Sequence, residues 1–92
     1  MLEKVRLALR ITTTAFDEEI KDLIVAALAD LGIAGVSNED ESDPLIIRAV
    51  VTYCKANFGE ADEYERLKAS YDEQKAQLQM ATGYTDWGDK NG

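Results

Sequence analysis

The most apolar part of the chain runs from Pro44 to Phe58, with the sequence PLIIRAVVTYCKANF. Polar residues interrupt it at only four positions, which are left to face water: Arg48, Thr52, Lys55 and Asn57. A helix that is apolar around almost its whole circumference is buried on most sides. The pattern therefore predicts a central helix around which the rest of the chain packs.

The two ends of this stretch favour a helix over a strand, although its β-branched run would also suit a strand. Asp43 can cap the first free amides, and Pro44 at the first helical position loses no hydrogen bond. Gly59 marks the stop, and the length between these signals exceeds that of an ordinary strand.

Two helices are predicted before the central one. Leu2, Val5 and Leu9 recur at helical spacing and indicate a short first helix, which the three threonines 12–14 interrupt. A second helix is expected to start near Ala15, with Thr14 as its cap and acidic residues in its first turns. Its wide apolar face should touch neighbours on two sides, and Gly32 or Gly35 should end it.

A last helix is predicted over residues 60–81, longer than the others, with Asp62 as its cap and Gly83 after its end. Its narrow apolar stripe comprises Tyr64, Leu67, Tyr71, Gln74 and Leu78. Such a stripe on a polar helix packs either on the subunit's own core or on a partner, and both interpretations can hold together. Residues 33–43 between the second and central helices read as an acidic surface loop.

The expected fold is all-α: a small bundle of about four helices in one domain, residues 1–82, followed by a short extended and flexible tail over 83–92. The tail carries Tyr84 and Trp87, aromatic residues that either fold back loosely or anchor a partner. The predicted core comprises Val5, Leu9, Phe16, Ile20, Leu23, Ile24, Leu28, Ile46, Val50, Val51, Cys54 and Phe58.

Charge and composition exclude several classes of function. The chain of 92 residues has a formal net charge of −8, which is unsuited to gripping nucleic acid, because affinity there comes mainly from neutralising phosphates. The acidic loop lacks the alternating residue order of a calcium site, and carboxylates in helix first turns are explained by capping. The N-terminus is too charged for a secretion signal and no apolar run approaches a membrane span, so we expect a cytoplasmic protein.

The chain also lacks the usual catalytic devices. It contains no His and one Cys, so no zinc or haem ligand set can form, and Cys54 lies in the most apolar stretch, as a core residue would. Without a Gly-rich phosphate loop or a nucleophile motif, we expect no cofactor, no metal and no enzymatic activity.

The order of these features resembles the phage head-tail connector, or adaptor, proteins that complete the capsid beneath the portal ring. The resemblance lies in LEKVRLALRI before the Thr-rich turn, then FDEEIKDLIVAAL, DPLIIRAVVTYCKANF and YERLKASYDEQKAQL, covering roughly residues 2 to 80. It implies a helical virion subunit that forms a ring, usually twelve-fold, between the portal and the tail-side completion protein. DNA would pass through the lumen without being read, and assembly would take place in the host cytoplasm.

The candidate partner-binding residues lie on the last helix and in the tail. They are Arg66, Lys68, Tyr71, Lys75, Tyr84 and Trp87. The cations among them would meet the acidic start of the second helix, or the loop Glu39 to Asp43, on the next subunit. Exposed pairs of this kind are individually weak, so the subunit is expected to be a monomer or a mixed small oligomer until a portal templates the ring.

Two other classes of protein remain as alternatives. One is a small cytoplasmic protein-binding adaptor or antitoxin-like regulator that acts through its last helix and tail. The other is a helix-turn-helix DNA reader, which the long acidic loop and the negative charge disfavour.

Overall fold

A computed structural model of the chain describes residues 1–36, 42–58 and 61–81. These residues form four α-helices and one short 3₁₀ turn: α1 (Leu2–Ala8), α2 (Asp17–Ile33), α3 (Pro44–Phe58), η1 (Ala61–Glu63) and α4 (Tyr64–Met80). The described parts contain no strand of a sheet, so the prediction of an all-α bundle is confirmed. None of the described helices is long and apolar enough to cross a membrane.

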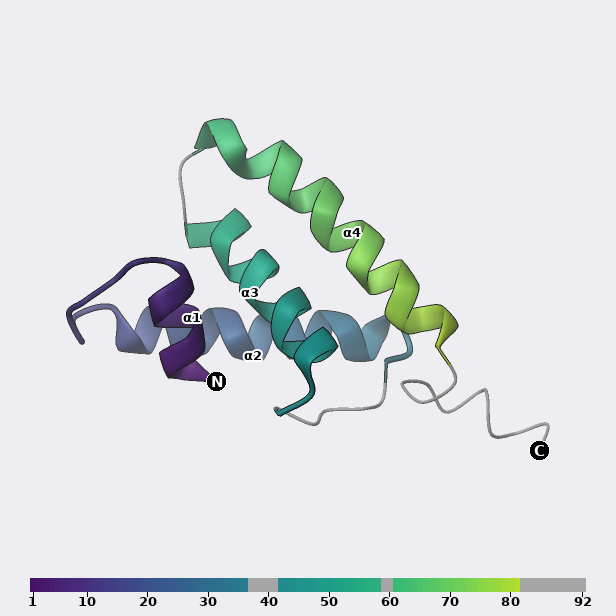
Figure 1. The fold of residues 1–92 in the computed structure, drawn as a ribbon, viewed down its shortest axis with the longest axis horizontal. Coiled ribbons are helices and arrows are strands. Elements are labelled where there is room, and N and C mark those ends of the chain that lie inside the picture. Colours follow the sequence, from purple (N-terminus) through teal and green to yellow (C-terminus); the bar gives the residue numbers. More distant parts are fainter. Residues whose placement is uncertain (37–41, 59–60, 82–92) are drawn as a thin grey trace.

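Helix α3 is the centre of the bundle, as its apolar sequence predicts. It contacts α1, α2 and α4, and α1 also packs on α2. In Figure 1, α1 crosses the first half of α2, and α4 runs along the side of α3. The central position of α3 explains why polar residues are so few along it.

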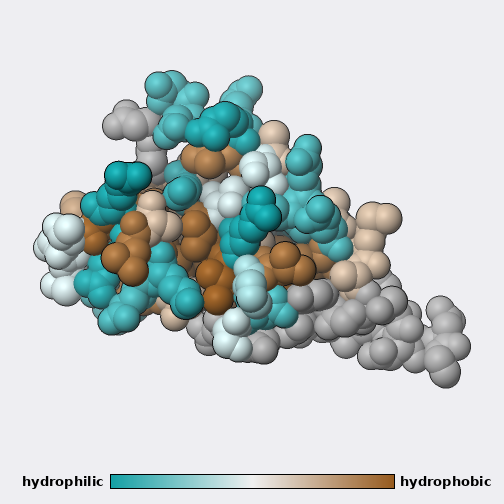
Figure 2. Space-filling view, viewed as in Figure 1, coloured by the Kyte–Doolittle hydropathy of each residue, from teal (hydrophilic) through white to brown (hydrophobic). Residues whose placement is uncertain are grey.

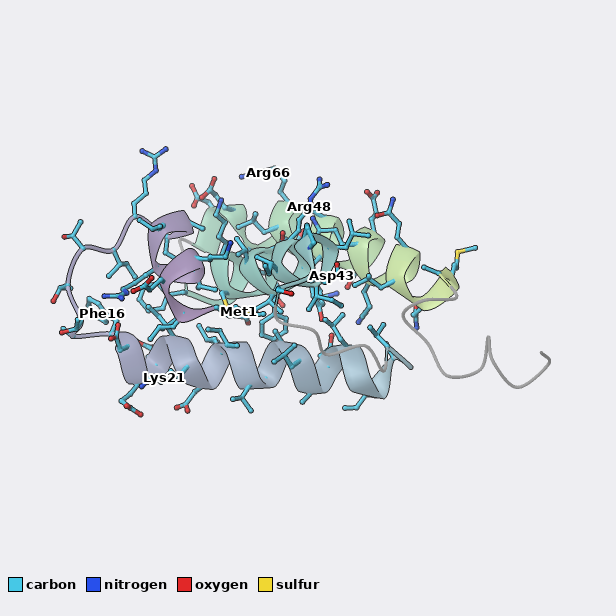
Figure 3. The ribbon with its side chains drawn as sticks, turned by 60° about the horizontal axis from the view of Figure 1, so that its bottom comes forward. Met1, Phe16, Lys21, Asp43, Arg48 and Arg66 are labelled. Carbon is cyan, nitrogen blue, oxygen red and sulfur yellow. The ribbon has the colours of Figure 1, made fainter. Side chains whose placement is uncertain are left out.

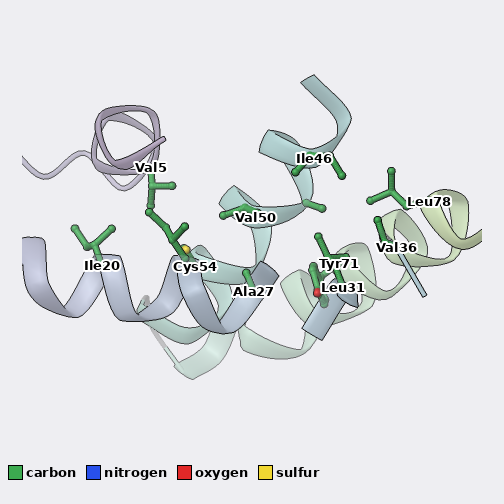
Figure 4. Close-up of a cluster of buried hydrophobic side chains, with 12 residues drawn as sticks. Val5, Ile20, Ala27, Leu31, Val36, Ile46, Val50, Cys54, Tyr71 and Leu78 are labelled. Atoms are coloured by element: carbon green, nitrogen blue, oxygen red, sulfur yellow. The ribbon is translucent and has the colours of Figure 1, made fainter. Parts of the chain in front are cut away.

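The hydrophobic core joins all four helices and includes half of the predicted residues as buried side chains (Figure 4). Of the remaining predicted residues, Leu9, Leu23, Leu28, Val51 and Phe58 pack half-buried against it. Phe16 is wrong as a core residue: it is 43% exposed, and its ring lies edge-on against Phe58 at 5.5 Å. Seven buried hydrophobic residues of the described chain were not predicted: Ala27, Leu31, Val36, Ala49, Ala56, Tyr71 and Leu78.

The start of α3 follows the predicted capping. The Asp43 carboxylate accepts hydrogen bonds from the backbone N–H groups of Leu45 at 2.8 Å and of Ile46 at 3.4 Å. Thr52, expected to face water, is buried instead, because its hydroxyl donates to the Arg48 carbonyl at 2.9 Å and so needs no water. Leu45, in the first turn, is half-exposed.

The start of α2 differs from the prediction, while its end agrees. The helix begins at Asp17 with Phe16 as N-cap and no side-chain cap, and Thr14 does not fill that role. Thr13 instead accepts a hydrogen bond from the Ala15 N–H at 3.2 Å, which closes a turn one step before the helix. At the other end Gly35 has a φ of 95°, the left-handed backbone that the prediction required of a glycine there.

The start of α4 also differs. Residues Ala61–Glu63 form the 3₁₀ turn η1, and Glu63 is the N-cap with no side-chain cap bond, so Asp62 does not cap the helix. Helix α4 is long, as predicted, but with 17 residues it equals α2 and does not exceed it. Its end at Met80 precedes Gly83, which lies outside the described residues together with the rest of the tail.

Candidate functional site

A polar network joins α2 to α4 across the side of α3. Tyr71 of α4 is 4% exposed, and its hydroxyl donates a hydrogen bond of 2.6 Å to the Asp30 carboxylate of α2. Lys75, one turn further along α4, donates to the same carboxylate oxygen at 3.2 Å, with its ammonium 5.3 Å from the centre of the Tyr71 ring. The Tyr71 ring also packs edge-on against the ring of Tyr53 of α3, at 5.2 Å between ring centres. The network therefore fixes all three helices at one point.

The protonation states of this network are fixed at neutral pH. Burial raises the pKa of Asp30, but the hydrogen bonds from Tyr71 and Lys75 and the nearby positive charges outweigh it, so the pKa lies below its ordinary value. Burial and the Asp30 charge hold the pKa of Tyr71 well above its ordinary value. Asp30 thus stays ionised and Tyr71 stays protonated.

A shallow groove of about 270 Å³ lies over this network and is lined by Asp30, Tyr53, Tyr64, Lys68 and Tyr71, among others. A general acid or base works best with a pKa near the operating pH. The pKa of Asp30 is lowered and the pKa of Tyr71 is raised, so both lie farther from neutral pH than their ordinary values. The arrangement suits a structural tie between helices, not proton transfer.

Cys54 is a core residue, as predicted. Its side chain is fully buried between the helices, and burial raises the pKa of the thiol to about 12. The thiolate is the nucleophilic form of cysteine, and at neutral pH this thiol is almost entirely protonated. Within the described parts of the chain, no three His, Cys, Asp or Glu side chains gather as a metal-binding group.

The predicted partner-binding residues of α4 already have partners inside the subunit. Lys68 contacts Asp72 at 3.0 Å, and Arg66 contacts Glu63 at 2.8 Å, both as exposed pairs along the helix. Tyr71 and Lys75 serve the Asp30 network described above. Of these residues, Arg66 and Lys68 are the exposed ones, so they are the ones that a partner can reach directly. The predicted anchors Tyr84 and Trp87 lie outside the described residues.

A second groove, which we name the basic groove, lies between the end of α1, the end of α3 and the start of α4. It measures about 330 Å³ and is lined by Ala8, Leu9, Arg10, Lys55, Glu63, Arg66 and Leu67. Three cations thus face one carboxylate here, on a chain whose net charge is −8. Hydrophobic residues show between hydrophilic ones on the face of the molecule that Figure 2 presents.

Arg10 is held in an unusual backbone conformation beside this groove. Its φ is 61°, and no other residue but glycine has a positive φ in the described chain. The Arg10 N–H donates to the Leu7 carbonyl at 3.0 Å and the Ile11 N–H to the Arg6 carbonyl at 3.0 Å, which is the helix-ending motif that normally places Gly at this position. This role was not predicted from the sequence, although the position of Arg10 directly after Leu9, the last apolar residue of the repeat, was an available signal.

A third feature is the face of α2 that points away from the bundle, which we name the α2 outer face. Its exposed residues follow one another at helical spacing: Glu18, Lys21, Asp22, Val25, Ala29 and Ile33. The first half of this face carries two carboxylates and Lys21, with one net negative charge, and the second half is apolar, with Val25 66% and Ile33 88% exposed. Exposed apolar residues gathered on one helix face mark an interaction surface more often than isolated ones do.

Comparison with known proteins identifies the family of the chain. A family model described as phage connector protein matches residues 1–85, a range that contains every described helix. The curated proteins and the solved structures that were searched gave no match. The chain therefore belongs to the phage connector protein family.

Proposed function

We propose that this protein is a head-tail connector that assembles as a ring beneath the portal and forms part of the DNA conduit to the tail. Membership of the phage connector family, through the match over residues 1–85, carries this proposal. The family gives the chain a structural role in the virion and association with other head and tail proteins. The assembly into a ring, the position beneath the portal and the role as a DNA conduit go beyond this and are our proposal.

The charge of the chain supports passage of DNA without binding. Each subunit of the ring carries a net charge of −8, and an acidic lumen would repel phosphate by the reverse of the attraction that DNA-binding proteins use. DNA would then move through during packaging and ejection without sticking. The role is structural and includes no catalytic step.

The partners of the ring are the portal protein on one side and the tail-side completion protein on the other. We expect the ring to be twelve-fold when templated by the portal, and the free subunit to be a monomer or small oligomer. The subunit has a core of its own, so it does not need a partner in order to fold. The subunit would be incorporated at the head-tail junction while the virion assembles in the host cytoplasm.

The proposal is tested by removing the protein from an infection. A phage whose gene for this chain carries an early stop codon should produce heads that contain DNA but no tails, as seen by negative-stain electron microscopy. Supplying the wild-type chain from a plasmid should restore tailed particles. Immunogold labelling of purified virions should then mark the head-tail junction. Tailed, infectious particles made without the chain, or virions that lack it, would refute the connector role.

A further inference from the structure

The basic groove and the α2 outer face match each other in charge and in hydropathy. The groove combines Arg10, Lys55 and Arg66 with the half-buried side chains of Leu9 and Leu67. The α2 outer face combines the carboxylates of Glu18 and Asp22, with Lys21 between them, in its first half and apolar side chains in its second half. We propose that the basic groove of one subunit receives the α2 outer face of a second copy of this chain.

Charge complementarity favours a second copy as the occupant. Two molecules of net charge −8 repel each other over most of their surfaces, and opposite charges across an interface select the orientation in which they meet. The basic groove gathers three of the ten Lys and Arg residues of the chain at one end of the bundle. Glu18 and Asp22 are exposed on α2, where a cation of a second subunit can reach them, and Glu18 also contacts Lys21 of its own helix at 3.7 Å.

The backbone of Arg10 gives a second, independent reason. A non-glycine residue with positive φ costs the fold free energy, and such residues concentrate where a function holds them in place. The chain does place a glycine at the equivalent position after α2, Gly35. An arginine at the strained position after α1 is therefore explained by what its side chain does at the groove.

The placement of the two surfaces decides the symmetry of the contact. Figure 3 shows Lys21 of α2 and Arg66 of α4 pointing to opposite sides of the molecule. Two different surfaces on opposite sides produce a head-to-tail contact, which closes into a ring or continues as a filament. This inference rests on the proposed connector function only for the expectation that the contact closes into a ring.

The strength of one contact should be low. A groove of about 330 Å³ holds only a few side chains, and exposed ion pairs contribute little and are screened by salt. Helix α2, with 17 residues, is about 25 Å long, so its apolar second half can continue the contact beyond the groove. We expect self-association that weakens as salt is raised and that becomes strong only when a ring closes.

Two variants each remove one surface. Arg10→Glu with Arg66→Glu reverses two charges of the basic groove, and Val25→Asp with Ile33→Asp places charges in the apolar half of the α2 outer face. All four side chains are exposed, so the fold should be retained, which circular dichroism and a thermal melt verify. The matched controls are Arg48→Glu and Met80→Asp, an exposed cation and an exposed apolar residue outside both surfaces. If either double variant fails to fold, Arg10→Gly and Ile33→Asp take its place.

Sedimentation equilibrium of the full chain, up to about 1 mM protein, gives the result. The wild type and both controls should show a mass that rises with concentration, while each double variant alone should associate at least about tenfold more weakly. A mixture of the two double variants should stop at a dimer, because the first keeps an intact α2 outer face and the second an intact groove. A wild type that stays monomeric at this concentration, double variants that associate like the wild type, or a mixture without dimer would each overturn the proposal.

The outcome is separable from that of the connector role. If the protein labels the head-tail junction but both double variants associate as strongly as the wild type, the connector function is supported and this interface is refuted. If the protein is absent from virions but the two double variants form the mixed dimer, the interface is supported and the connector function is refuted.

Discussion

Arg10 and Gly35 occupy the same position in two helix-ending motifs, the first after α1 and the second after α2. Their φ angles are 61° and 95°, and in each motif the N–H of the following residue reaches back to a carbonyl of the helix, at 3.0 Å from Ile11 and 2.9 Å from Val36. Glycine adopts this backbone without cost, whereas a residue with a Cβ is strained there. Stability alone would favour glycine at both positions.

Arg10→Gly should therefore stabilise the fold, although it removes a charged side chain. We expect the free energy of unfolding to rise by up to about 1 kcal/mol, because relief of the left-handed strain exceeds the entropy that glycine adds to the unfolded chain. Urea titration followed by circular dichroism measures it. The matched control is Lys4→Gly within α1, which should destabilise by about 1 kcal/mol. Loss of stability in Arg10→Gly would show that the arginine supports the fold.

Tyr71→Phe should destabilise the subunit while leaving its core intact. The ring remains packed against Tyr53, but the Asp30 carboxylate loses its 2.6 Å hydrogen bond, at a cost of about 1 to 2 kcal/mol. Tyr64→Phe is the matched control, because Tyr64 is exposed, and it should change little. A double-mutant cycle with Asp30→Asn should give a coupling energy of about 1 kcal/mol. Strictly additive effects would mean that the bond adds nothing to stability.

Alkaline pH should weaken the fold through its buried thiol. The pKa of Cys54 is raised from the ordinary value of 9.0 to about 12, so the folded chain holds its proton where the unfolded chain loses it. The stabilisation by the neutral thiol is complete below pH 9.0 and is lost as the pH rises towards 12. Cys54→Ala should lower stability at pH 7 by cavity formation, yet show a flatter decline above pH 9.0 in thermal melts. An unchanged slope would contradict the assignment.

Substitution of a buried and of an exposed valine tests which helix faces form the core. Val50 is fully buried in α3, and Val50→Ala should cost about 1 to 3 kcal/mol, because it leaves a cavity. Val25 is exposed on α2, and Val25→Ala should change the monomer by no more than about 0.5 kcal/mol. Equal melting temperatures for Val50→Ala and the wild type would remove α3 from the core and undo the architecture.

The pattern of apolar residues predicted which segments are helical, but it did not predict for every helix which face is buried. Helix α3 and its cap Asp43 were predictable, because the signals at both ends were local. On α2, apolar residues surround most of the helix, so periodicity alone could not separate buried Ile24 from exposed Val25. The neighbours in space decide such cases, and a single sequence does not contain them.

The candidate sites show the same division between local and distant information. The bond between Tyr71 and Asp30 joins residues 41 positions apart in the chain, which no spacing rule connects. Tyr71 was accordingly predicted as a partner contact, whereas its hydroxyl is used inside the subunit. Arg10 was within reach of sequence reasoning, since a helix that ends without glycine leaves some other residue in the left-handed position.

Removal of residues 83–92 tests the predicted anchors Tyr84 and Trp87 without disturbing the described core. All buried residues of that core lie at or before Leu78, so the truncated chain should fold with an unchanged melting temperature. Its recruitment to portal-bearing capsids should fall, because aromatic side chains are preferred anchors and one can contribute a few kcal/mol. The matched control is the full chain with Asp86→Asn and Asp89→Asn, which keeps both aromatic residues. If the truncated chain completes heads as well as the full one, the tail is no anchor, and the exposed residues Arg66 and Lys68 of α4 become the better candidates.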